Sequence, residues 1–591
     1  MRRFVHYEVL VVLCSVLVAG RAACDSCLSS YDYSANIECL AEPLAPQYRG
    51  GIVKNPAFDS GLYGWTAFGK AKIGLEKVKR NKFIVASSRS LPNDSFSQNF
   101  HIKKDLLHTF SAWVQISEGK ETVAAFLKIP DQESIVIGSV IAKSGCWSML
   151  KGGFTLDQNL KAQLYFLSNN TRVGLWLDNV SLKPFTKEQW SKQQKKSIEK
   201  VRKRKIRIHV YSHEGKKLHG VKITINQTRP SFLLGCATAK PLIDFKAYQE
   251  WFAHRFTASS FNNEMKWYYT ELNKEHENYT VPDAMISFLK KHGISIRGHN
   301  IFWDKPTMNM DWVRNLTRQE LLAAAVRRMG SVMSRYSGDI FQWDVMNENL
   351  HFSYYEDRLG PNASAMFYKI AQALDPQATM FLNEYCTLEK PLDMEAIPSK
   401  YIEKLREIKS FPGNENMVVG IGLQAHFKLR PNISYIRSSL DVLGATKMPI
   451  WLTEFDVIRG PEQLIQYEEI LREAYSHPAV DGIILWSGWN FGCSEECLKG
   501  SRDKTKKCLE ICLTDNNFKN LPAGDLVDKL IQEWKTSNVK GFTDKNGVYE
   551  HRVFHGEYNA IFSHPPTYLN VTKKFNVTNE ESQPLDIKIY L

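Results

Sequence analysis

Eight apolar runs, separated by segments with a helical pattern, constrain the fold of this chain more than any other feature. They begin at Phe232, Arg255, Ile294, Ile340, Ala378, Met417, Pro449 and Gly482. Successive runs start about 23 to 46 residues apart, the length of a strand plus a crossover helix, and buried parallel strands are continuously apolar rather than alternating. Eight such units predict a (β/α)8 barrel, in which the strands all end at the face that carries catalytic groups.

The regions that flank these runs have a different pattern. Residues 51–185 contain short alternating strands, such as His108–Gln115, between clusters of Gly, Asn, Asp and Ser, which is typical of an all-β sandwich. Residues 186–230 predict a charged linker, helical over Lys187–Lys205, and strands that lead into the barrel. We therefore expect a multidomain fold: an all-β, jelly-roll-like sandwich, a (β/α)8 TIM barrel over residues 231–540, and a short β-rich C-terminal tail over 541–591.

The N-terminus has the three parts of a signal peptide, predicted over residues 1–23. Met1-Arg-Arg is followed by an apolar run from Val9 to Ala19 and by small residues before cleavage after Ala22 or Ala23. The run is well short of the ~20 residues that span a bilayer, so we expect secretion and no membrane partner. Glycosylation sequons fit this route and lie at Asn93, Asn169, Asn179, Asn226, Asn278, Asn315, Asn362, Asn432, Asn570 and Asn576.

Cysteine usage also fits an oxidising compartment. After removal of Cys14 with the signal, ten cysteines remain: Cys24, Cys27 and Cys39 in the segment 24–50, then Cys146, Cys236, Cys386, Cys493, Cys497, Cys508 and Cys512. The pair Cys24/Cys27 and the cluster Cys493–Cys512 allow either zinc ligation or disulfides, and secretion favours disulfides. We expect no metal site.

The charge of the chain narrows the class of partner. Its formal net charge is +13, which favours an acidic partner. Secretion argues against nucleic acid. The basic stretch Lys192–Arg207 resembles a nuclear signal but is more simply a solvated linker face. No cofactor is expected.

Two glutamates follow the fourth and seventh runs. Glu348 ends Trp343-Asp-Val-Met-Asn-Glu, and Glu454 ends Trp451-Leu-Thr-Glu. Two carboxyl groups that face one cavity can cleave a glycosidic bond, because one protonates the leaving oxygen while the other acts from the opposite face of the sugar. Strand ends of a barrel bring such side chains together.

Six motifs at strand ends give the chain a family resemblance. They are Asn263-Glu-Met-Lys-Trp, Arg297-Gly-His-Asn-Ile-Phe-Trp, Trp343-Asp-Val-Met-Asn-Glu, Leu382-Asn-Glu-Tyr, Gly420-Ile-Gly-Leu-Gln-Ala-His and Leu452-Thr-Glu-Phe-Asp. By these motifs, residues 231–540 resemble glycoside hydrolase family 10, the endo-β-1,4-xylanases. Residues 51–185, with Ser144-Gly-Cys-Trp-Ser and Leu177-Asp-Asn-Val-Ser-Leu, resemble carbohydrate-binding module family 22, and the pairing is similar to plant members.

The resemblance implies roles for the strand-end residues. Glu348 would be the acid/base and Glu454 the nucleophile; Asn347 would bind the sugar 2-OH, and His426, close to Asp456, would hold Glu454 ionised. The implied substrate-binding residues are Asn263, Lys266, His299, Trp303, Tyr385, Gln424 and Trp486. The chain departs from the family at Asn262, at Asp304 and in its long Cys493–Cys512 loop. How the protein contacts the sugars on the glycone side of the scissile bond therefore stays an open question at this point.

We therefore expect a monomeric, secreted endo-β-1,4-xylanase of the extracellular space or cell wall, which hydrolyses xylan by a retaining double displacement. Two alternatives remain: a xylan transglycosylase with the same covalent intermediate, and a catalytically weak protein that binds wall polysaccharide. In the sandwich, five aromatic side chains are candidates for sugar stacking or for plain core packing: Trp65, Trp113, Trp147, Tyr165 and Trp176.

Overall fold

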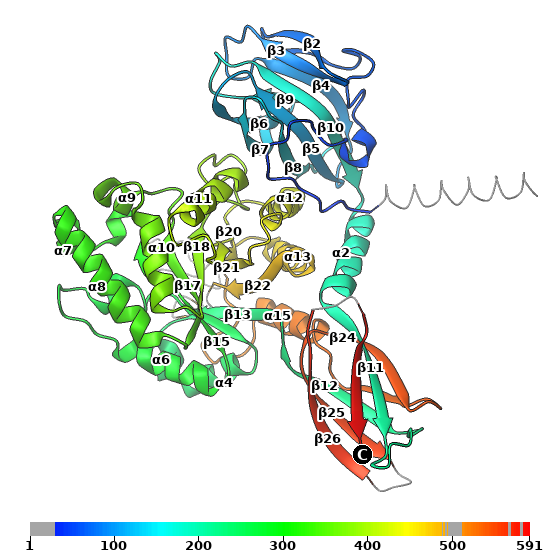
Figure 1. Cartoon of the computed structure of the whole chain (residues 1–591), viewed down its shortest axis with the longest axis vertical. Coiled ribbons are helices and arrows are strands. Elements are labelled where there is room, and N and C mark those ends of the chain that lie inside the picture. Colours follow the sequence, from blue (N-terminus) through cyan, green and yellow to red (C-terminus); the bar gives the residue numbers. More distant parts are fainter. Residues whose placement is uncertain (1–29, 487, 491–492, 494–510, 565–568, 580–582) are drawn as a thin grey trace, which may run out of the picture. The chain divides into compact units, whose positions relative to one another are not determined.

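A computed structural model of the chain describes residues 30–486, 488–490, 493, 511–564, 569–579 and 583–591. The chain divides into two compact units (Figure 1). One comprises residues 1–196 with 432–445, and the other comprises 197–431 with 446–591.

The first unit is built on a ten-stranded antiparallel sheet folded over itself (Figure 1), which confirms the predicted sandwich. The strand order is β1-β4-β9-β6-β7-β8-β5-β10-β3-β2. The strands are β1 (Thr66–Phe68), β2 (Lys72–Val78), β3 (Asn81–Ser87), β4 (Ser95–Ile102), β5 (Leu107–Ile116), β6 (Lys120–Lys128), β7 (Ile135–Lys143), β8 (Ser148–Thr155), β9 (Leu160–Leu167) and β10 (Leu175–Phe185).

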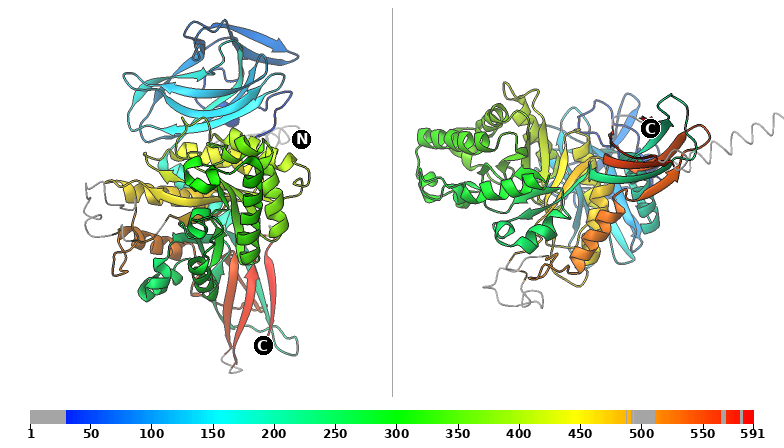
Figure 2. Two further views of the ribbon diagram at one scale, coloured as in Figure 1. Left: turned by 90° about the vertical axis from the view of Figure 1, so that its left-hand side faces the viewer. Right: turned by 90° about the horizontal axis from the view of Figure 1, so that it is seen from below.

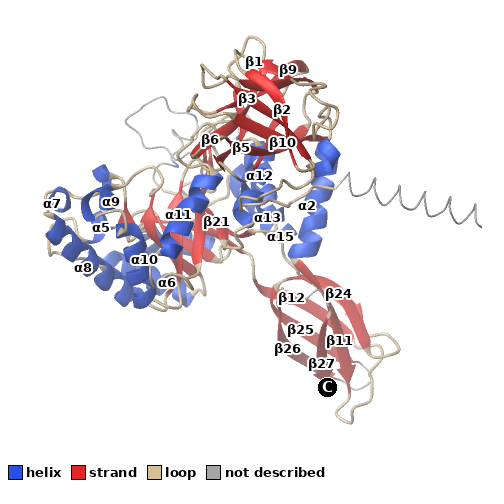
Figure 3. Cartoon of the chain, turned by 45° about the horizontal axis from the view of Figure 1, so that its top comes forward, coloured by secondary structure: helices blue, strands red, loops and turns tan. Residues whose placement is uncertain are grey.

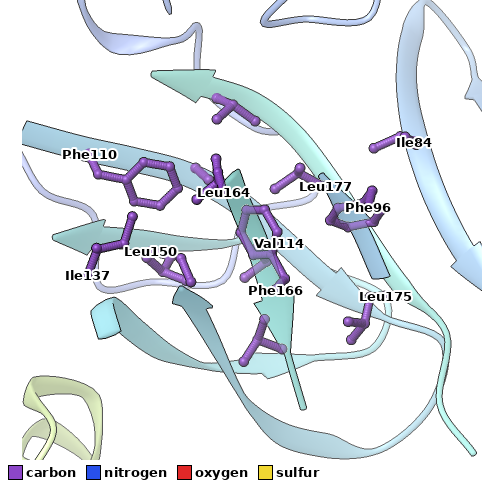
Figure 4. Close-up of a cluster of buried hydrophobic side chains, with 14 of the residues drawn as sticks. Ile84, Phe96, Phe110, Val114, Ile137, Leu150, Leu164, Phe166, Leu175 and Leu177 are labelled. Atoms are coloured by element: carbon purple, nitrogen blue, oxygen red, sulfur yellow. The ribbon is translucent and has the colours of Figure 1, made fainter. Parts of the chain in front are cut away.

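An apolar core fills the space between the two halves of this sheet (Figure 4). Phe96, Phe110, Leu150, Phe166 and Leu177 point into it from five different strands, and none is more than 1% exposed. Alternate positions of each strand supply these side chains, as the period of two predicted. The backbones of β7 and β8 approach so closely that a Cβ at residue 152 would lie 1.8 Å from a carbonyl oxygen, so only glycine fits there.

Helix α12 (Ile433–Gly444) belongs to this unit and packs on β8. Lys151 of β8 forms an ion pair with Asp441 of the helix at 2.7 Å, with both side chains at most 2% exposed. The Tyr31 hydroxyl donates a 2.6 Å hydrogen bond to the same carboxylate. A buried charge pair is tolerated only when its remaining hydrogen-bonding positions are filled, and Tyr31 fills one of them.

The described cysteines form two disulfides, Cys39–Cys146 and Cys493–Cys512. The second excludes the zinc alternative for Cys493, whereas Cys24, Cys27, Cys497 and Cys508 lie outside the described residues. Cys236 and Cys386 are free. Cys236 is fully buried on a barrel strand, where packing rather than pairing accounts for it.

The second unit contains the predicted barrel. Eight parallel strands pair in sequence, and β15 pairs with β17 to complete the ring. They are β13 (Leu233–Thr238), β14 (Ala258–Phe261), β15 (Ser295–Gly298), β17 (Ile340–Asn347), β18 (Thr379–Glu384), β19 (Val419–Leu423), β21 (Ile450–Val457) and β22 (Val480–Leu485), with short β16 (Phe302–Trp303) and β20 (His426–Phe427) beside the ring. Each of the eight apolar runs became one of these strands.

Helices surround the barrel strands (Figure 3). The principal ones are α4 (Lys246–Ala253), α6 (Thr280–Lys291), α8 (Arg318–Tyr336), α10 (Ala363–Leu374), α11 (Pro398–Ser410), α13 (Gln463–Ser476) and α15 (Pro522–Glu533). Helix α8 shows why such segments are helical: Thr317 and Glu320 form a capping box at its start, and buried Leu321, Arg328 and Val332 recur at helical spacing. In the part of the chain that the structure describes, no helix is both long and apolar enough to cross a membrane.

Strands from both ends of the barrel sequence form one further β-sandwich (Figure 2). Its three-stranded sheet has the order β24-β11-β27 and its four-stranded sheet the order β23-β12-β25-β26. The strands are β11 (Lys203–Tyr211), β12 (Lys222–Pro230), β23 (Val539–Phe542), β24 (Val548–Phe554), β25 (Gly556–His564), β26 (Leu569–Val577) and β27 (Leu585–Tyr590). The charged linker and the C-terminal tail are therefore parts of one body, into which the barrel is inserted.

This pairing corrects the helix expected over Lys187–Lys205. Helix α2 (Lys187–Val201) ends early, and β11 begins at Lys203. In β11, Ile206 and Ile208 are fully buried and alternate with basic residues. That period of two marks a strand with one buried face, and it outweighs the helical preference of Lys and Arg.

The two faces of β25 provide a stability test. Phe562 is fully buried in the core of this C-terminal sandwich, whereas the adjacent Ile561 is 40% exposed. We expect Phe562→Ala to destabilise the sandwich by about 3–5 kcal/mol, because it leaves a cavity, and the control Ile561→Ala to change stability by less than about 1 kcal/mol. Calorimetry of the full chain measures both. Equal effects of the two substitutions would contradict this placement of β25.

Candidate active site

The predicted site residues all lie at or just beyond the carboxyl ends of the barrel strands, where the fold places catalytic groups. The strands or the loops directly after them supply the residues as follows: β14, Asn263 and Lys266; β15, His299; β16, Trp303; β17, Asn347 and Glu348; β18, Tyr385; β19, Gln424; β20, His426; β21, Glu454 and Asp456; β22, Trp486.

The two glutamates are both buried, Glu348 at 8% and Glu454 at 5% exposure. Two residues contact both of them. Asn383 accepts a 2.9 Å hydrogen bond from the backbone N–H of Glu348 through its carbonyl, and its Nδ2 donates to Oε1 of Glu454 at 2.8 Å. The Gln424 side chain donates to Oε1 of Glu348 at 3.3 Å, and its carbonyl accepts from the N–H of Glu454 at 3.1 Å. The glutamates therefore share two neighbours, as a cooperating pair requires.

Glu348 has a left-handed backbone, with φ 63°. Residues other than glycine adopt this conformation rarely, and a site that holds one of them there uses the surrounding structure to do so. Here the bond from the Glu348 N–H to Asn383 fixes the turn that follows β17. The turn sets the direction in which the carboxyl group leaves the strand.

Asn383 is a site residue that the sequence analysis did not assign. Its Nδ2 also donates to Oδ1 of Asn347 at 2.9 Å, and Thr453 donates to its Oδ1 at 2.5 Å. One amide thus orients Asn347 and Glu454 together. The motif Leu382-Asn-Glu-Tyr contained the signal, but a strand-end asparagine by itself does not indicate what it contacts.

His426 lies between two carboxylates. Its Nδ1 is 2.8 Å from Oδ1 of Asp456 and its Nε2 is 3.3 Å from Oε2 of Glu454. Burial lowers the pKa of His426, but hydrogen bonds to Asp456 and Glu454 outweigh burial and raise the pKa to about 10. The imidazole is therefore protonated at neutral pH and donates to both carboxylates.

Glu454 is held ionised by its neighbours. Burial raises the pKa of this carboxyl group, but the charges of His299, His426 and Lys266, with the His426 hydrogen bond, outweigh burial and lower the pKa to about 2. Above that pH the group is a carboxylate, the form that can act as a nucleophile or an electrostatic stabiliser.

His299 is positioned by a second buried carboxylate. Its Nδ1 lies 2.8 Å from Asp344, and its Nε2 lies 3.8 Å from Oε1 of Glu454. Asp344 in turn accepts a 2.6 Å bond from Arg297. Asp344 and Arg297 were quoted in the sequence motifs without a role, and the structure gives them one: they orient His299 toward Glu454.

Lys266 and two tryptophans form one wall of the site. The Lys266 ammonium lies 4.7 Å from the ring centre of Trp303 and 5.9 Å from that of Trp486. It also donates to Oδ1 of Asn263 at 3.5 Å. Burial lowers the pKa of Lys266 despite the nearby carboxylates. The Trp486 ring also makes edge contacts with the rings of His299 and His426. Trp486, Lys266 and the two histidines therefore lie around one part of the site.

Tyr385 stacks on His351, with ring centres 3.9 Å apart and an interplanar angle of 11°. The His351 Nδ1 is 2.8 Å from Glu384. Burial lowers the pKa of His351, but Glu384 and Asp393 outweigh it and raise the pKa. His351 was not predicted, because its contact with Tyr385 joins two separate strand ends.

Asp304, a position at which the chain departs from the family pattern, is also buried. It accepts hydrogen bonds from Nδ2 of Asn349 at 2.7 Å and from the N–H of Tyr355 at 3.0 Å. Burial raises the pKa of Asp304 to about 6, although these bonds oppose the rise. Asp304 therefore ties the segment after Glu348 to the loop after β16. Within the described ranges, no group of three or more His, Cys, Asp or Glu side chains is arranged to hold a metal ion.

Comparisons with known proteins agree with this geometry. The model of "Glycosyl hydrolase family 10" matches residues 225–527, and that of "Carbohydrate binding domain" matches residues 50–172. Endo-1,4-beta-xylanase 5 of Arabidopsis thaliana is 39% identical over 87% of this chain and 92% of its own length. Endo-1,4-beta-xylanase 4 of the same plant is 36% identical over the full length of both chains.

The family match covers the whole barrel, including all the strand ends that carry the two glutamates and their neighbours. Both Arabidopsis relatives extend over the sandwich as well as the barrel. This chain is a glycoside hydrolase that belongs to glycosyl hydrolase family 10 and carries an N-terminal carbohydrate-binding domain.

Proposed function

We propose that the protein is a secreted endo-β-1,4-xylanase that hydrolyses the xylan backbone with retention of configuration. The observation that carries the proposal is the state of Glu454: a buried carboxylate, ionised above a pKa of about 2, that shares Asn383 and Gln424 with a second buried glutamate. The names of the Arabidopsis relatives support xylan as the substrate.

In the first step, Glu348 donates its proton to the leaving glycosidic oxygen while Glu454 attacks the anomeric carbon. The bond to the leaving sugar breaks, and a covalent glycosyl–enzyme forms at Glu454. In the second step Glu348, now a carboxylate, takes a proton from water, and the water oxygen displaces Glu454. Two inversions give net retention, for which we expect the carboxyl groups to lie about 5–5.5 Å apart.

The surrounding groups have distinct tasks in this mechanism. Protonated His426 and the Asn383 amide keep Glu454 ionised and aimed. Asn347, oriented by Asn383, donates to the sugar 2-OH, where bonds strengthen in the transition state. The remaining donors and aromatic rings bind the glycone sugars or the first leaving sugar: Asn263, Lys266, His299, Trp303, Tyr385, Gln424 and Trp486.

The first test removes each glutamate separately. We expect Glu454→Ala and Glu348→Ala each to lower kcat on xylan by at least about 10³-fold, because either loss removes one half of the double displacement. With an aryl β-xylobioside, azide should restore turnover to Glu454→Ala and give the inverted glycosyl azide. Glu557→Ala on the distant C-terminal sandwich, an exposed glutamate, is the matched control. Near wild-type rates in either site variant would contradict the assignment.

NMR of the first reducing ends decides the stereochemistry for the unmodified protein. β-Anomers that appear before mutarotation support retention, whereas initial α-anomers would require an inverting mechanism. Mass spectrometry of the same products separates hydrolysis, which gives only shorter chains, from transglycosylation, which also gives longer ones.

The second test uses pH. His426→Gln keeps a hydrogen-bond donor but removes the positive charge, so the pKa of Glu454 should rise from about 2. Activity needs ionised Glu454, and therefore the acid limb of kcat/KM should move to higher pH in this variant. His292→Gln, an exposed histidine on the barrel exterior, should keep the wild-type profile. An unchanged acid limb in His426→Gln would exclude this role for His426.

Secretion and a wall location belong to the same proposal. The two disulfides support an oxidising compartment, and the predicted signal lies outside the described residues.

The N-terminal sandwich, on this proposal, holds the enzyme on xylan. Among its candidate aromatics, Trp65, Trp113 and Trp147 are buried in two apolar clusters, and core packing explains them. Tyr165 is buried as well, at 6% exposure, and stacks on Phe68 at 4.2 Å and on Phe126 at 5.3 Å. Trp176 differs, because its side chain is only partly buried, and it stacks on Phe83 at 5.3 Å. Planar aromatic surfaces of this kind suit sugar rings.

Affinity electrophoresis of the full chain tests the role of Trp176. The Glu454→Ala background prevents digestion of the xylan in the gel. We expect soluble xylan to retard the protein and Trp176→Ala to weaken the retardation several-fold. Tyr63→Ala, which removes a tyrosine that is 66% exposed, should retain the parent mobility. Equal retardation of the Trp176 and Tyr63 variants would contradict sugar binding at Trp176 and place the binding face elsewhere on the sandwich.

A further inference from the structure

Three glycosylation sequons occur in the C-terminal sandwich, at Asn226, Asn570 and Asn576. All three belong to its four-stranded sheet: Asn226 to β12, and the other two to β26. In the sheet register Asn226 is opposite Asn559, Asn570 is opposite Ser563 and Asn576 is opposite Glu557. The three partners occupy alternate positions of β25, so the three asparagines share one face.

That face is the outer one. The intervening positions of β25, Tyr558, Ala560 and Phe562, are at most 1% exposed and form the core. The side chains of Asn570 and Asn576 are exposed, and that of Asn226 is partly buried. The Oδ1 of Asn226 accepts from the N–H of Asn538, while its Nδ2 donates to no other described residue.

Two other sequons in the chain, at Asn179 and Asn432, are placed differently. Asn179 is 9% exposed. Asn432 uses its Nδ2 to donate to the carbonyl of Gly153 at 3.0 Å, and Ser434, the third residue of its sequon, is fully buried. Since a glycan is attached through Nδ2 and needs a surface position, the folded structure has no room for one at either residue.

The same outer face has two features that an attached glycan would cover. Phe542 is 65% exposed and Ile561 is 40% exposed. Ile561 is opposite Thr224 of β12 and Thr572 of β26. Asn226 and Asn570 are each two residues from these partners along the same strands and therefore lie next to Ile561 on the same face. Exposed apolar groups on the outer face of a sheet favour self-association.

Strand β26 is also a sheet edge. It pairs with β25, and no other described strand pairs with it. Its nine residues are long for an edge strand, and a long unpaired edge is a template for pairing with another chain. Asn570 and Asn576 lie near its two ends, about 20 Å apart at 3.4 Å per residue, and Lys573 and Lys574 lie between them.

We propose that Asn226, Asn570 and Asn576 carry N-linked glycans, and that these glycans shield the outer face and the β26 edge of the C-terminal sandwich. In each transfer Nδ2 attacks C1 of a sugar diphosphate donor. The C1–Nδ2 bond forms, the C1–O bond to the diphosphate breaks with its electron pair leaving on the diphosphate, and the amide gives up one proton. The proposal rests on the secretion proposed above, because the donor is encountered only in that pathway.

The test is site-by-site occupancy in the full chain secreted from a eukaryotic host. Enzymatic release of glycans in heavy-oxygen water converts each occupied asparagine to a mass-tagged aspartate, which peptide mass spectrometry locates. We expect tags at residues 226, 570 and 576, and none at Asn179 or Asn432. Thr572→Ala should remove one glycan, and the matched variant Thr572→Ser, which keeps the sequon, should retain it.

The outcomes separate this inference from the proposed function. Tags at Asn169 or Asn362 without tags at the three sheet positions would overturn the inference and leave secretion intact. A chain that stays inside the cell without glycans would overturn both, whereas xylan hydrolysis is measured independently of either result.

Self-association tests the shielding. In sedimentation velocity, the triple variant Asn226→Gln/Asn570→Gln/Asn576→Gln should shift toward dimers and larger species, whereas Asn169→Gln should sediment as the parent protein does. A triple variant that stays monomeric at the same concentration would overturn the shielding role.

Discussion

A buried, ionised carboxylate at Glu454 is the feature on which the rest of the active site depends. Removal of a carboxylate from water is unfavourable unless charges and hydrogen bonds replace the water. His426, Lys266 and the Asn383 amide provide this replacement, and each of them comes from a different strand end. The barrel is therefore not a passive support, because only a closed ring of strands brings these donors to one carboxyl group.

The requirement extends beyond the groups that touch Glu454. His426 needs Asp456 on its other nitrogen, and His299 needs Asp344, which in turn needs Arg297. A buried polar group without a hydrogen-bond partner costs about 1–3 kcal/mol. Each buried partner of Glu454 therefore needs a hydrogen-bond partner of its own. This explains why six sequence motifs, rather than two glutamates, identify the site.

The C-terminal sandwich shows how chain order and spatial order diverge. Strands β11 and β12 precede the barrel, and β23 to β27 follow it, yet the barrel separates them only in sequence. Their shared core includes Ile206, Ile223, Phe562 and Val577. The sequence did not show what the β-like tail pairs with, because its partner strands β11 and β12 lie more than 300 residues earlier in the chain.

The sequence by itself determined the barrel, the N-terminal sandwich and the positions of the two glutamates, because hydrophobic periodicity and strand-end motifs are local properties of the chain. It did not determine that Asn383 contacts both Asn347 and Glu454, that His351 stacks on Tyr385, or that β11 pairs with β24 and β27. Tertiary structure decided those points, since each depends on residues from separate strands that approach one another only when the ring or the sheet is complete.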